Sequence, residues 1–205
     1  METPDAATLA ADLRRYLEHK QTLFSPELSI ALADVNTFTA SILKRGWATT
    51  IAELQSHANV RSAAPFIETC DAIIEHHLRI IKEEKDRELI RKSLFEAYVY
   101  LGGAEHVFEP PNEARILSFL KRHGSKGFAA LFLSLHLFNV IRQEIEDKVR
   151  VIMPDQKFFE LYMLGTEAVC RDIVTATVNV PGARLDQQWA AAVCTNIEKQ
   201  LLLRP

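Results

Sequence analysis

One short segment of the sequence places basic side chains and glycines together, just before the most apolar part of the chain. Its residues are Lys121, Arg122, His123, Gly124, Ser125, Lys126 and Gly127. Backbone N–H groups at the start of a helix, helped by cations and by glycines that allow close approach, form a natural site for an anion. We therefore take these seven residues as a candidate site for a phosphorylated ligand.

The same segment also has a purely structural interpretation, as the link between two helices. Basic residues suit the last turn of a helix, Gly124 is typical of a helix stop, and Ser125 can cap the following helix. The Gly-x-x-Gly spacing occurs in the nucleotide-clamping loops of KH modules, but those loops are built on a sheet and no strand is predicted here. The Walker pattern is not met, because Lys126 is followed by glycine rather than Ser or Thr. The link between helices is the simpler interpretation.

His136 is a second candidate, because it interrupts the apolar run from Phe128 to Ile141. A buried histidine at this point could bind a haem or another metal cofactor, or act as a base. Helical spacing argues for a different role, because five polar residues fall on one strip of the helix: His136, Asn139, Gln143, Glu146 and Arg150. Such a strip predicts the solvent-exposed edge of the helix, with cofactor binding by His136 as the alternative.

The remaining histidines and cysteines predict neither a metal site nor a nucleophile. His76 and His77 are adjacent, and neighbouring helical residues point about 100° apart, so the two cannot hold one metal together. The three cysteines lie far apart among apolar neighbours, without zinc spacing, at Cys70, Cys170 and Cys194. Free buried thiols are the simplest reading, and Gly-x-Ser-x-Gly is absent. We expect no cofactor and no metal.

Apolar residues at three- and four-residue spacing recur along almost the whole chain and predict an all-α protein. The clearest stripe runs from Leu28 to Leu43 and is closed by Gly46. We expect about eight helices in a single domain over 1–205, packed around a central apolar helix at about 126–150. The loop at 102–111 is a possible subdivision. The spacing leaves open whether 66–101 form one helix or two.

Composition narrows the classes of function that remain. The 205 residues carry a net charge of −3, whereas proteins that bind nucleic acid in general have a basic excess. The acidic start does not resemble a secretory signal, and the 14-residue run from Phe128 to Ile141 is too short to span a bilayer. We therefore expect a cytoplasmic protein without a membrane span.

Three kinds of function are compatible with this sequence. The first is a non-catalytic interaction or regulatory protein that binds a protein partner, or a second copy of itself, through helix surfaces. The second is a binder of a small ligand, which is either apolar or planar in a cavity lined by aromatic side chains, or phosphorylated at 121–127. The third is an enzyme with dispersed catalytic residues, which is the least favoured because no catalytic motif is present.

Overall fold

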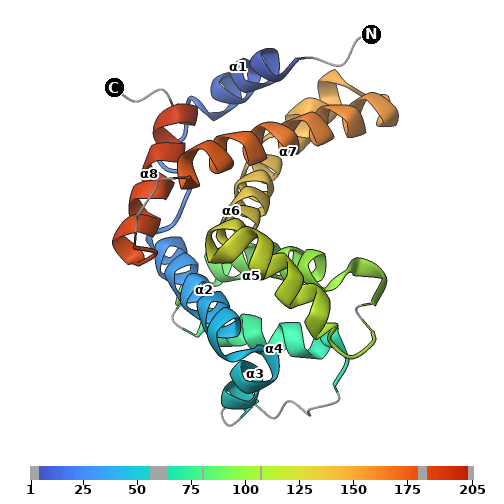
Figure 1. Ribbon diagram of the computed structural model, residues 1–205. Helices are drawn as coiled ribbons and strands as arrows, with labels where there is room; N and C mark the ends of the chain where they lie inside the picture. Colours follow the sequence, from blue (N-terminus) through green and yellow to red (C-terminus); the bar gives the residue numbers. More distant parts are fainter. Residues whose placement is uncertain (1–4, 56–63, 80, 107, 180–183, 203–205) are drawn as a thin grey trace.

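The computed structural model describes residues 5–55, 64–79, 81–106, 108–179 and 184–202, and these ranges contain helices and no strand (Figure 1). The α-helices, with a short 3-10 turn η1 between the fifth and the sixth, are α1 (Ala6–Leu17), α2 (Pro26–Arg45), α3 (Trp47–Gln55), α4 (Phe66–Leu78), α5 (Glu84–Gly102), η1 (Ala104–His106), α6 (Glu113–Ile152), α7 (Gln156–Val178) and α8 (Gln187–Leu202). The prediction of an all-α fold is therefore confirmed.

Helix α6 lies at the centre of this arrangement and contacts α1, α2, α3, α5 and α7 (Figure 1). Its apolar side chains are fully buried at Phe128, Phe132, Leu133, Leu137 and Ile141. A helix that is apolar on several faces needs partners on several sides, and the surrounding helices provide them. The central apolar helix predicted at about 126–150 is thus the second and longer part of α6.

Several helix ends lie where local sequence signals predict them. Pro26 begins α2, and Gly46 ends it with a positive φ of 85°. The side chain of Asn112 accepts a hydrogen bond from the Arg115 backbone N–H at the start of α6. Asp155 caps α7 in the same way, through the backbone N–H groups of its first turn. These contacts satisfy backbone donors that have no partner inside the helix.

The region 66–101 forms two helices rather than one. Helix α4 ends at Leu78 and α5 begins at Glu84, so the helix is interrupted before most of the charged run that starts at Lys82. The two helices pack against each other. At Gly102 an added Cβ would lie 2.0 Å from a ring carbon of Phe66, so glycine is required where α5 approaches α4.

By length and composition alone, α6 could cross a membrane. However, 56% of the apolar window that passes this test is buried inside the fold. The core helix of a globular protein has the same features, and the burial of α6 against five other helices agrees with that reading.

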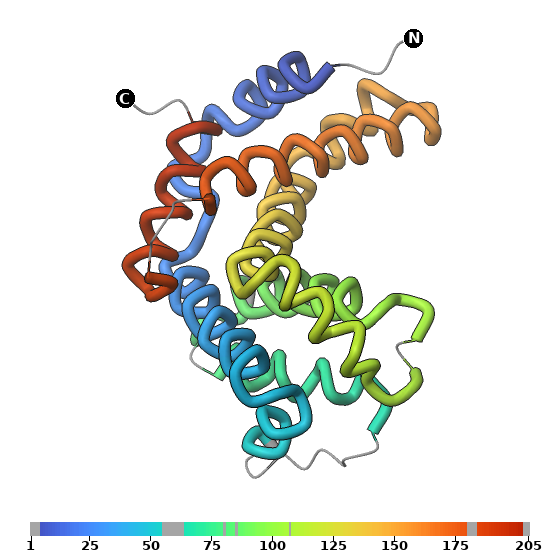
Figure 2. The backbone as a smooth tube through the Cα atoms, viewed as in Figure 1, coloured from blue at the N-terminus to red at the C-terminus, as the bar shows by residue number. Residues whose placement is uncertain are grey.

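The two helices predicted on either side of Gly124 meet directly at that residue, where α6 has a kink (Figure 2). Gly124 has φ 68° and ψ 179°, whereas the flanking residues are helical. This combination of angles is accessible almost only to glycine. The glycine therefore ends the first helix, as predicted, and lets the second begin at once in a new direction.

Replacing Gly124 by alanine is expected to lower the free energy of unfolding by about 1–3 kcal/mol, the usual cost of forcing a side chain into such a conformation. Nothing lies within 4 Å of an added Cβ, so backbone strain alone is tested. Urea denaturation measures the effect. Ser118→Ala, on the exposed side of the same helix, is the control and should leave stability nearly unchanged. Wild-type stability for Gly124→Ala would show that the kink does not require glycine.

Candidate functional site

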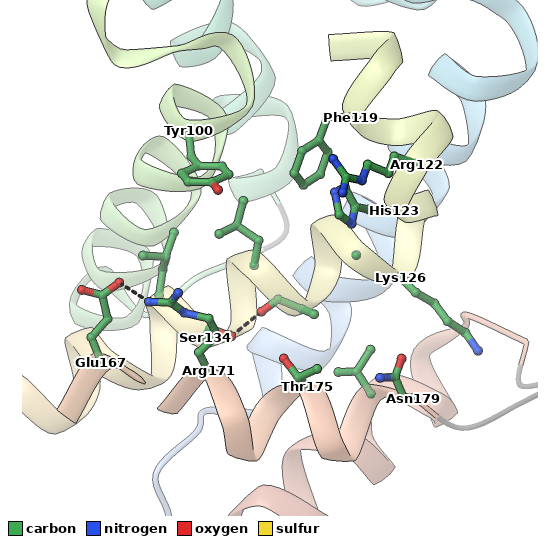
Figure 3. A pocket seen from close by; sticks show the side chains of 15 residues that line it. Tyr100, Phe119, Arg122, His123, Lys126, Ser134, Glu167, Arg171, Thr175 and Asn179 are labelled. Carbon is green, nitrogen blue, oxygen red and sulfur yellow. Dashed lines mark hydrogen bonds and ion pairs between the residues drawn. The ribbon is translucent and has the colours of Figure 1, made fainter. Parts of the chain in front are cut away.

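A cavity of about 610 Å³ lies where the kinked helix α6 faces α7 and the end of α5 (Figure 3). Its walls combine aromatic, basic and small apolar side chains. The lining residues are Tyr100, Phe119, Arg122, His123, Lys126, Gly127, Ala130, Leu131, Ser134, Leu135, Glu167, Arg171, Thr175, Val178 and Asn179. Ligand sites typically have volumes of about 300–1,000 Å³, so the cavity is large enough for a small molecule.

The kink at Gly124 divides the α6 residues of this cavity into two groups. Phe119, Arg122 and His123 come from the part before the kink, whereas the part after it supplies the floor, including Leu131 and Leu135. Helix α7 provides the opposite wall. The two stretches of α6 thus meet at an angle, and α7 lies across the open side of that angle.

Aromatic rings form one wall of the cavity. The ring centroids of Tyr100 and Phe119 are 6.3 Å apart in an edge-to-face arrangement. Phe119 and His123 follow at 4.7 Å, with their planes tilted by 39°. These separations are typical of favourable contacts between aromatic rings. The wall can therefore pack against a planar or apolar ligand.

The charged groups of the cavity are mostly cations. Arg122 and Lys126 come from α6, and Arg171 comes from α7, whereas Glu167 is the carboxylate among the lining residues. Glu167 accepts a hydrogen bond from Arg171 at 3.3 Å, which largely neutralises both (Figure 3). No ion pair joins Arg122 to any residue in the described ranges. The end of the cavity near Arg122 is therefore electropositive.

The structure brings part of the predicted 121–127 segment into this cavity. Arg122, His123, Lys126 and Gly127 line it, whereas Lys121 is exposed elsewhere and Ser125 is buried. The segment is helical on both sides of Gly124, so 121–123 end one helix and Ser125 begins the next. The side chains of Arg122 and Lys126 are the cations that this junction contributes to the cavity.

In addition to lining the cavity, Gly127 has a role in packing. An added Cβ at this position would lie 2.4 Å from the Cβ of His123. Glycine therefore allows the His123 side chain to lie over the helix just beyond the kink. The second glycine of the Gly-x-x-Gly spacing is explained by this contact between side chain and backbone.

The prediction that His136 lies on a solvent-exposed edge is wrong. His136 and Asn139 are both buried, while Gln143 and Arg150 on the same strip are exposed. His136 Nδ1 lies 3.2 Å from Ser93 Oγ of α5, and burial lowers the pKa of His136 to about 4. The strip changes from core to surface along its length, because α5 covers its first part only.

Asn139 completes the polar cluster around His136. Its amide donates to Ser93 Oγ at 3.1 Å and to Glu96 Oε2 at 2.8 Å, and the Ser93 hydroxyl donates to the Leu89 carbonyl at 2.9 Å. The cluster thus joins α5 to α6 by hydrogen bonds inside the core. Neither His136 nor Asn139 lines the cavity, so the structure gives His136 a place in core packing.

A second buried polar cluster links α2, α4 and α5, and sequence reasoning missed it. His77 Nδ1 lies 2.7 Å from Asp34 Oδ2, and His77 Nε2 lies 2.9 Å from the Tyr98 hydroxyl. A carboxylate can only accept, so in the neutral ring Nδ1 carries the hydrogen and Nε2 accepts from Tyr98. Burial alone would raise the pKa of Asp34, but the hydrogen bond from His77 and the basic side chains nearby outweigh it, so the pKa of Asp34 is lowered.

The sequence contains a signal for this cluster. His77 follows Cys70 and Ile73 by seven and four residues, so it continues the apolar stripe of α4 rather than its polar face. His77 and Tyr98 are both 0% exposed, so no ligand can reach their contact. The cluster is suited to holding three helices together and does not provide an accessible catalytic pair.

Cys70, Cys170 and Cys194 are free and buried, as the sequence predicts. Burial raises the pKa of Cys170 and of Cys194 to about 12, and it raises that of Cys70 further. A thiol must lose its proton to act as a nucleophile, so these three are unreactive where they lie. Within the described ranges, no group of His, Cys, Asp and Glu side chains is arranged to hold a metal ion.

Removing the hydroxyl of Tyr98 is expected to destabilise the fold, because it leaves His77 Nε2 buried without a donor. Tyr98→Phe should lower the free energy of unfolding by about 1–3 kcal/mol, the usual cost of an unsatisfied buried group. Chemical denaturation at pH 7 measures it. Tyr100→Phe, two residues away on an exposed ring, is the matched control and should change stability by less than about 0.5 kcal/mol. Equal effects for the two variants would contradict the role of the hydrogen bond.

The buried His136 is expected to make stability depend on pH. Its pKa is about 4 in the folded protein and about 6.5 when unfolded, so below pH 6.5 the unfolded chain binds the proton more readily. The free energy of unfolding should therefore fall as the pH falls through this window, by about 2 kcal/mol between pH 7 and 5. Urea titrations of wild type and His136→Gln compare the slopes. The variant should lose most of this dependence, whereas His106→Gln, at an exposed site, should keep it. An unchanged slope in His136→Gln would be the contrary result.

No family model, curated protein or solved structure matches this chain. The cavity is therefore the feature of the molecule from which a function can be inferred.

Proposed function

We propose that this protein binds a small anion with an apolar body, without catalysing a reaction, in the cavity between α6 and α7. The observation that carries the proposal is the position of Arg122, a cation without an ion-pair partner in the described ranges, beside a wall and floor that are largely apolar. A site of this kind selects for a ligand with both properties, because an apolar pocket with a few placed polar groups fixes orientation and specificity.

The apolar part of the ligand would lie against the aromatic wall of Tyr100 and Phe119 and above Leu131 and Leu135. These side chains offer no strong hydrogen bonds except the Tyr100 hydroxyl, so they favour an aromatic or aliphatic group. Burial of such a group provides affinity in proportion to the area removed from water.

The charged part of the ligand would lie toward Arg122 and His123. A guanidinium group binds a carboxylate, sulfonate or phosphate through paired hydrogen bonds, and such charge-assisted bonds are stronger than neutral ones. The phosphorylated ligand considered for 121–127 is one member of this class. The sequence also allowed an apolar or planar ligand in an aromatic-lined cavity. The proposed ligand combines the two alternatives, because one cavity contains both aromatic and basic side chains.

Binding is favoured over catalysis because the histidines and cysteines that could act as bases or nucleophiles by virtue of their contacts lie outside the cavity. Of the histidines within hydrogen-bond distance of another side chain, His77 and His136 are buried in the core and His106 lies on the surface beside Glu109, and none of the three lines the cavity. The cysteines are buried and protonated. A ligand in the cavity therefore meets cations and apolar surfaces, and it does not meet an activated nucleophile.

A protein-interaction function is the second candidate, and one observation favours it. The corner where α6 passes into α7 exposes large apolar side chains, with Val151 83% and Ile152 62% accessible. Exposed apolar clusters often mark surfaces that bind another protein. The cavity is preferred as the primary site because it combines shape, apolar lining and charge in one place.

Two fluorescent probes that differ by one group can test the proposal. 8-Anilinonaphthalene-1-sulfonate is an apolar anion, and N-phenyl-1-naphthylamine has the same rings without the charge. Arg122→Glu should weaken binding of the sulfonate at least tenfold, the effect of losing about 1.4 kcal/mol of charge-assisted contact, and should leave the neutral probe nearly unaffected. Fluorescence titration measures both.

Lys121→Glu is the matched control, because it changes the net charge equally at the adjacent residue, which is exposed and does not line the cavity. Its effect on the sulfonate should be less than about threefold, as expected for a screened surface charge. If Lys121→Glu and Arg122→Glu weaken binding equally, the sulfonate does not bind in the cavity and the proposal is wrong.

A further inference from the structure

The groove between α6 and α7 extends beyond the cavity described above. A second cavity of about 440 Å³ lies further along the same pair of helices. Its lining residues are Phe138, Arg142, Arg150, Gln156, Phe159, Glu160, Met163, Leu164 and Glu167. Glu167 lines both cavities, so the two adjoin at this residue.

The order of the lining residues shows that the two cavities follow one another along the helices. The first combines the α6 residues 122–135 with the α7 residues 167–179, and the second combines 138–150 with 156–167. From Gly127 to Phe138, a helix rising about 1.5 Å per residue covers about 16 Å. An extended hydrocarbon advances about 1.3 Å per carbon, so this stretch of the groove matches about 12 to 13 carbon atoms beyond the head group.

The charges along this groove differ between its two ends. In the second cavity, Glu146 accepts hydrogen bonds from Arg142 at 2.7 Å and from Arg150 at 2.9 Å, which also lowers the pKa of Glu146. The Arg150 guanidinium in addition lies 3.9 Å from the centre of the Phe159 ring. Both of these guanidinium groups are thus held by one carboxylate, whereas Arg122 at the other end has no ion pair within the described ranges.

The floor of the second cavity is apolar and partly accessible. Phe138 and Met163 lie against the core, and Leu164 is 61% exposed although it is a large apolar side chain. At the junction, the carboxylate of Glu167 is held by Arg171, so the passage between the cavities presents a paired charge. An apolar chain could thus continue from the first cavity into the second.

We propose that the ligand of this groove is a single-chain lipid anion, with its head group beside Arg122 and His123 and its hydrocarbon chain extended past Glu167 to Phe138 and Leu164. This assignment rests on the proposed binding function and specifies its ligand. Arg122, without an ion pair in the described ranges, lies at one end, and the apolar side chains of Phe138, Met163 and Leu164 lie beyond Glu167. This order argues for an occupant that has an anionic head followed by an apolar chain. A compact aromatic anion fills only the first cavity.

Octanoate and palmitate, which share a carboxylate and differ by eight methylene groups, test the length of the site. Each can be titrated against bound 8-anilinonaphthalene-1-sulfonate below its critical micelle concentration. Palmitate should displace the probe at least about thirtyfold more tightly than octanoate, because additional methylene groups are buried along the groove. Arg122→Glu should weaken both fatty acids by a similar factor.

Leu164→Glu tests the far end of the groove directly. It places a carboxylate where the end of the chain would lie, at a site exposed enough to tolerate the change. It should weaken palmitate about tenfold and leave octanoate unchanged. Leu161→Glu, on the same helix but outside both cavities, is the matched control and should change neither.

The outcomes separate this inference from the function on which it rests. Equal affinities of octanoate and palmitate, or insensitivity of palmitate to Leu164→Glu, would overturn the lipid assignment while binding of the sulfonate at Arg122 stands. If instead an acidic amphipathic helical peptide displaces the probe and palmitate does not, the occupant is a partner helix and the lipid assignment is also wrong. If neither sulfonate nor fatty acid depends on Arg122, the proposed function fails with it.

Discussion

Burial of the second part of α6 is the constraint on which the rest of this structure depends. Its apolar side chains are covered by helices from both halves of the chain, with α2 and α5 preceding it and α7 following. Phe128, Phe132 and Leu137 are completely inaccessible, and burying side chains of this size stabilises a fold by about 2 kcal/mol each. The other helices pack around this one, so the floor of the cavity is formed by a helix whose opposite faces lie in the core.

The cavity arises because α6 does not continue straight. A straight helix would carry Phe119 and Arg122 along the same axis as Leu131, and the two groups could not face each other across a corner. The backbone angles of Gly124 turn the helix between them, and Gly127 leaves room for His123 at the turn. Both glycines that suggested a phosphate loop therefore help to shape the cavity, Gly124 through the direction of the helix and Gly127 through the room it leaves for His123.

The sequence predicts what local physics determines and misses what depends on distant partners. The apolar stripe of α2 and its stop at Gly46 follow from neighbouring residues, and the structure confirms them. The burial of His136 was misjudged and the role of His77 was overlooked, because their partners, Ser93 and Asp34, are each 43 residues away. Hydrogen-bonding groups can lie in the core when such partners exist, and spacing along one helix does not reveal them. The cavity was not predictable either, because it needs the angle of the kink and the position of α7.

The residues of the two polar clusters do not line the cavity, so the hydrogen bonds that hold the core together are separate from the proposed binding site. His136 and Asn139 point from α6 toward α5, where their hydrogen bonds are satisfied by protein groups. Lys126, Ala130 and Ser134, at four-residue spacing, belong to the face that lines the cavity. Polar groups that are fully satisfied inside the core have little to offer a ligand, whereas a cation at the surface gains most from an anion that also removes apolar surface from water. The face of α6 opposite α7 combines cations with apolar side chains, so it is the face that suits such an anion.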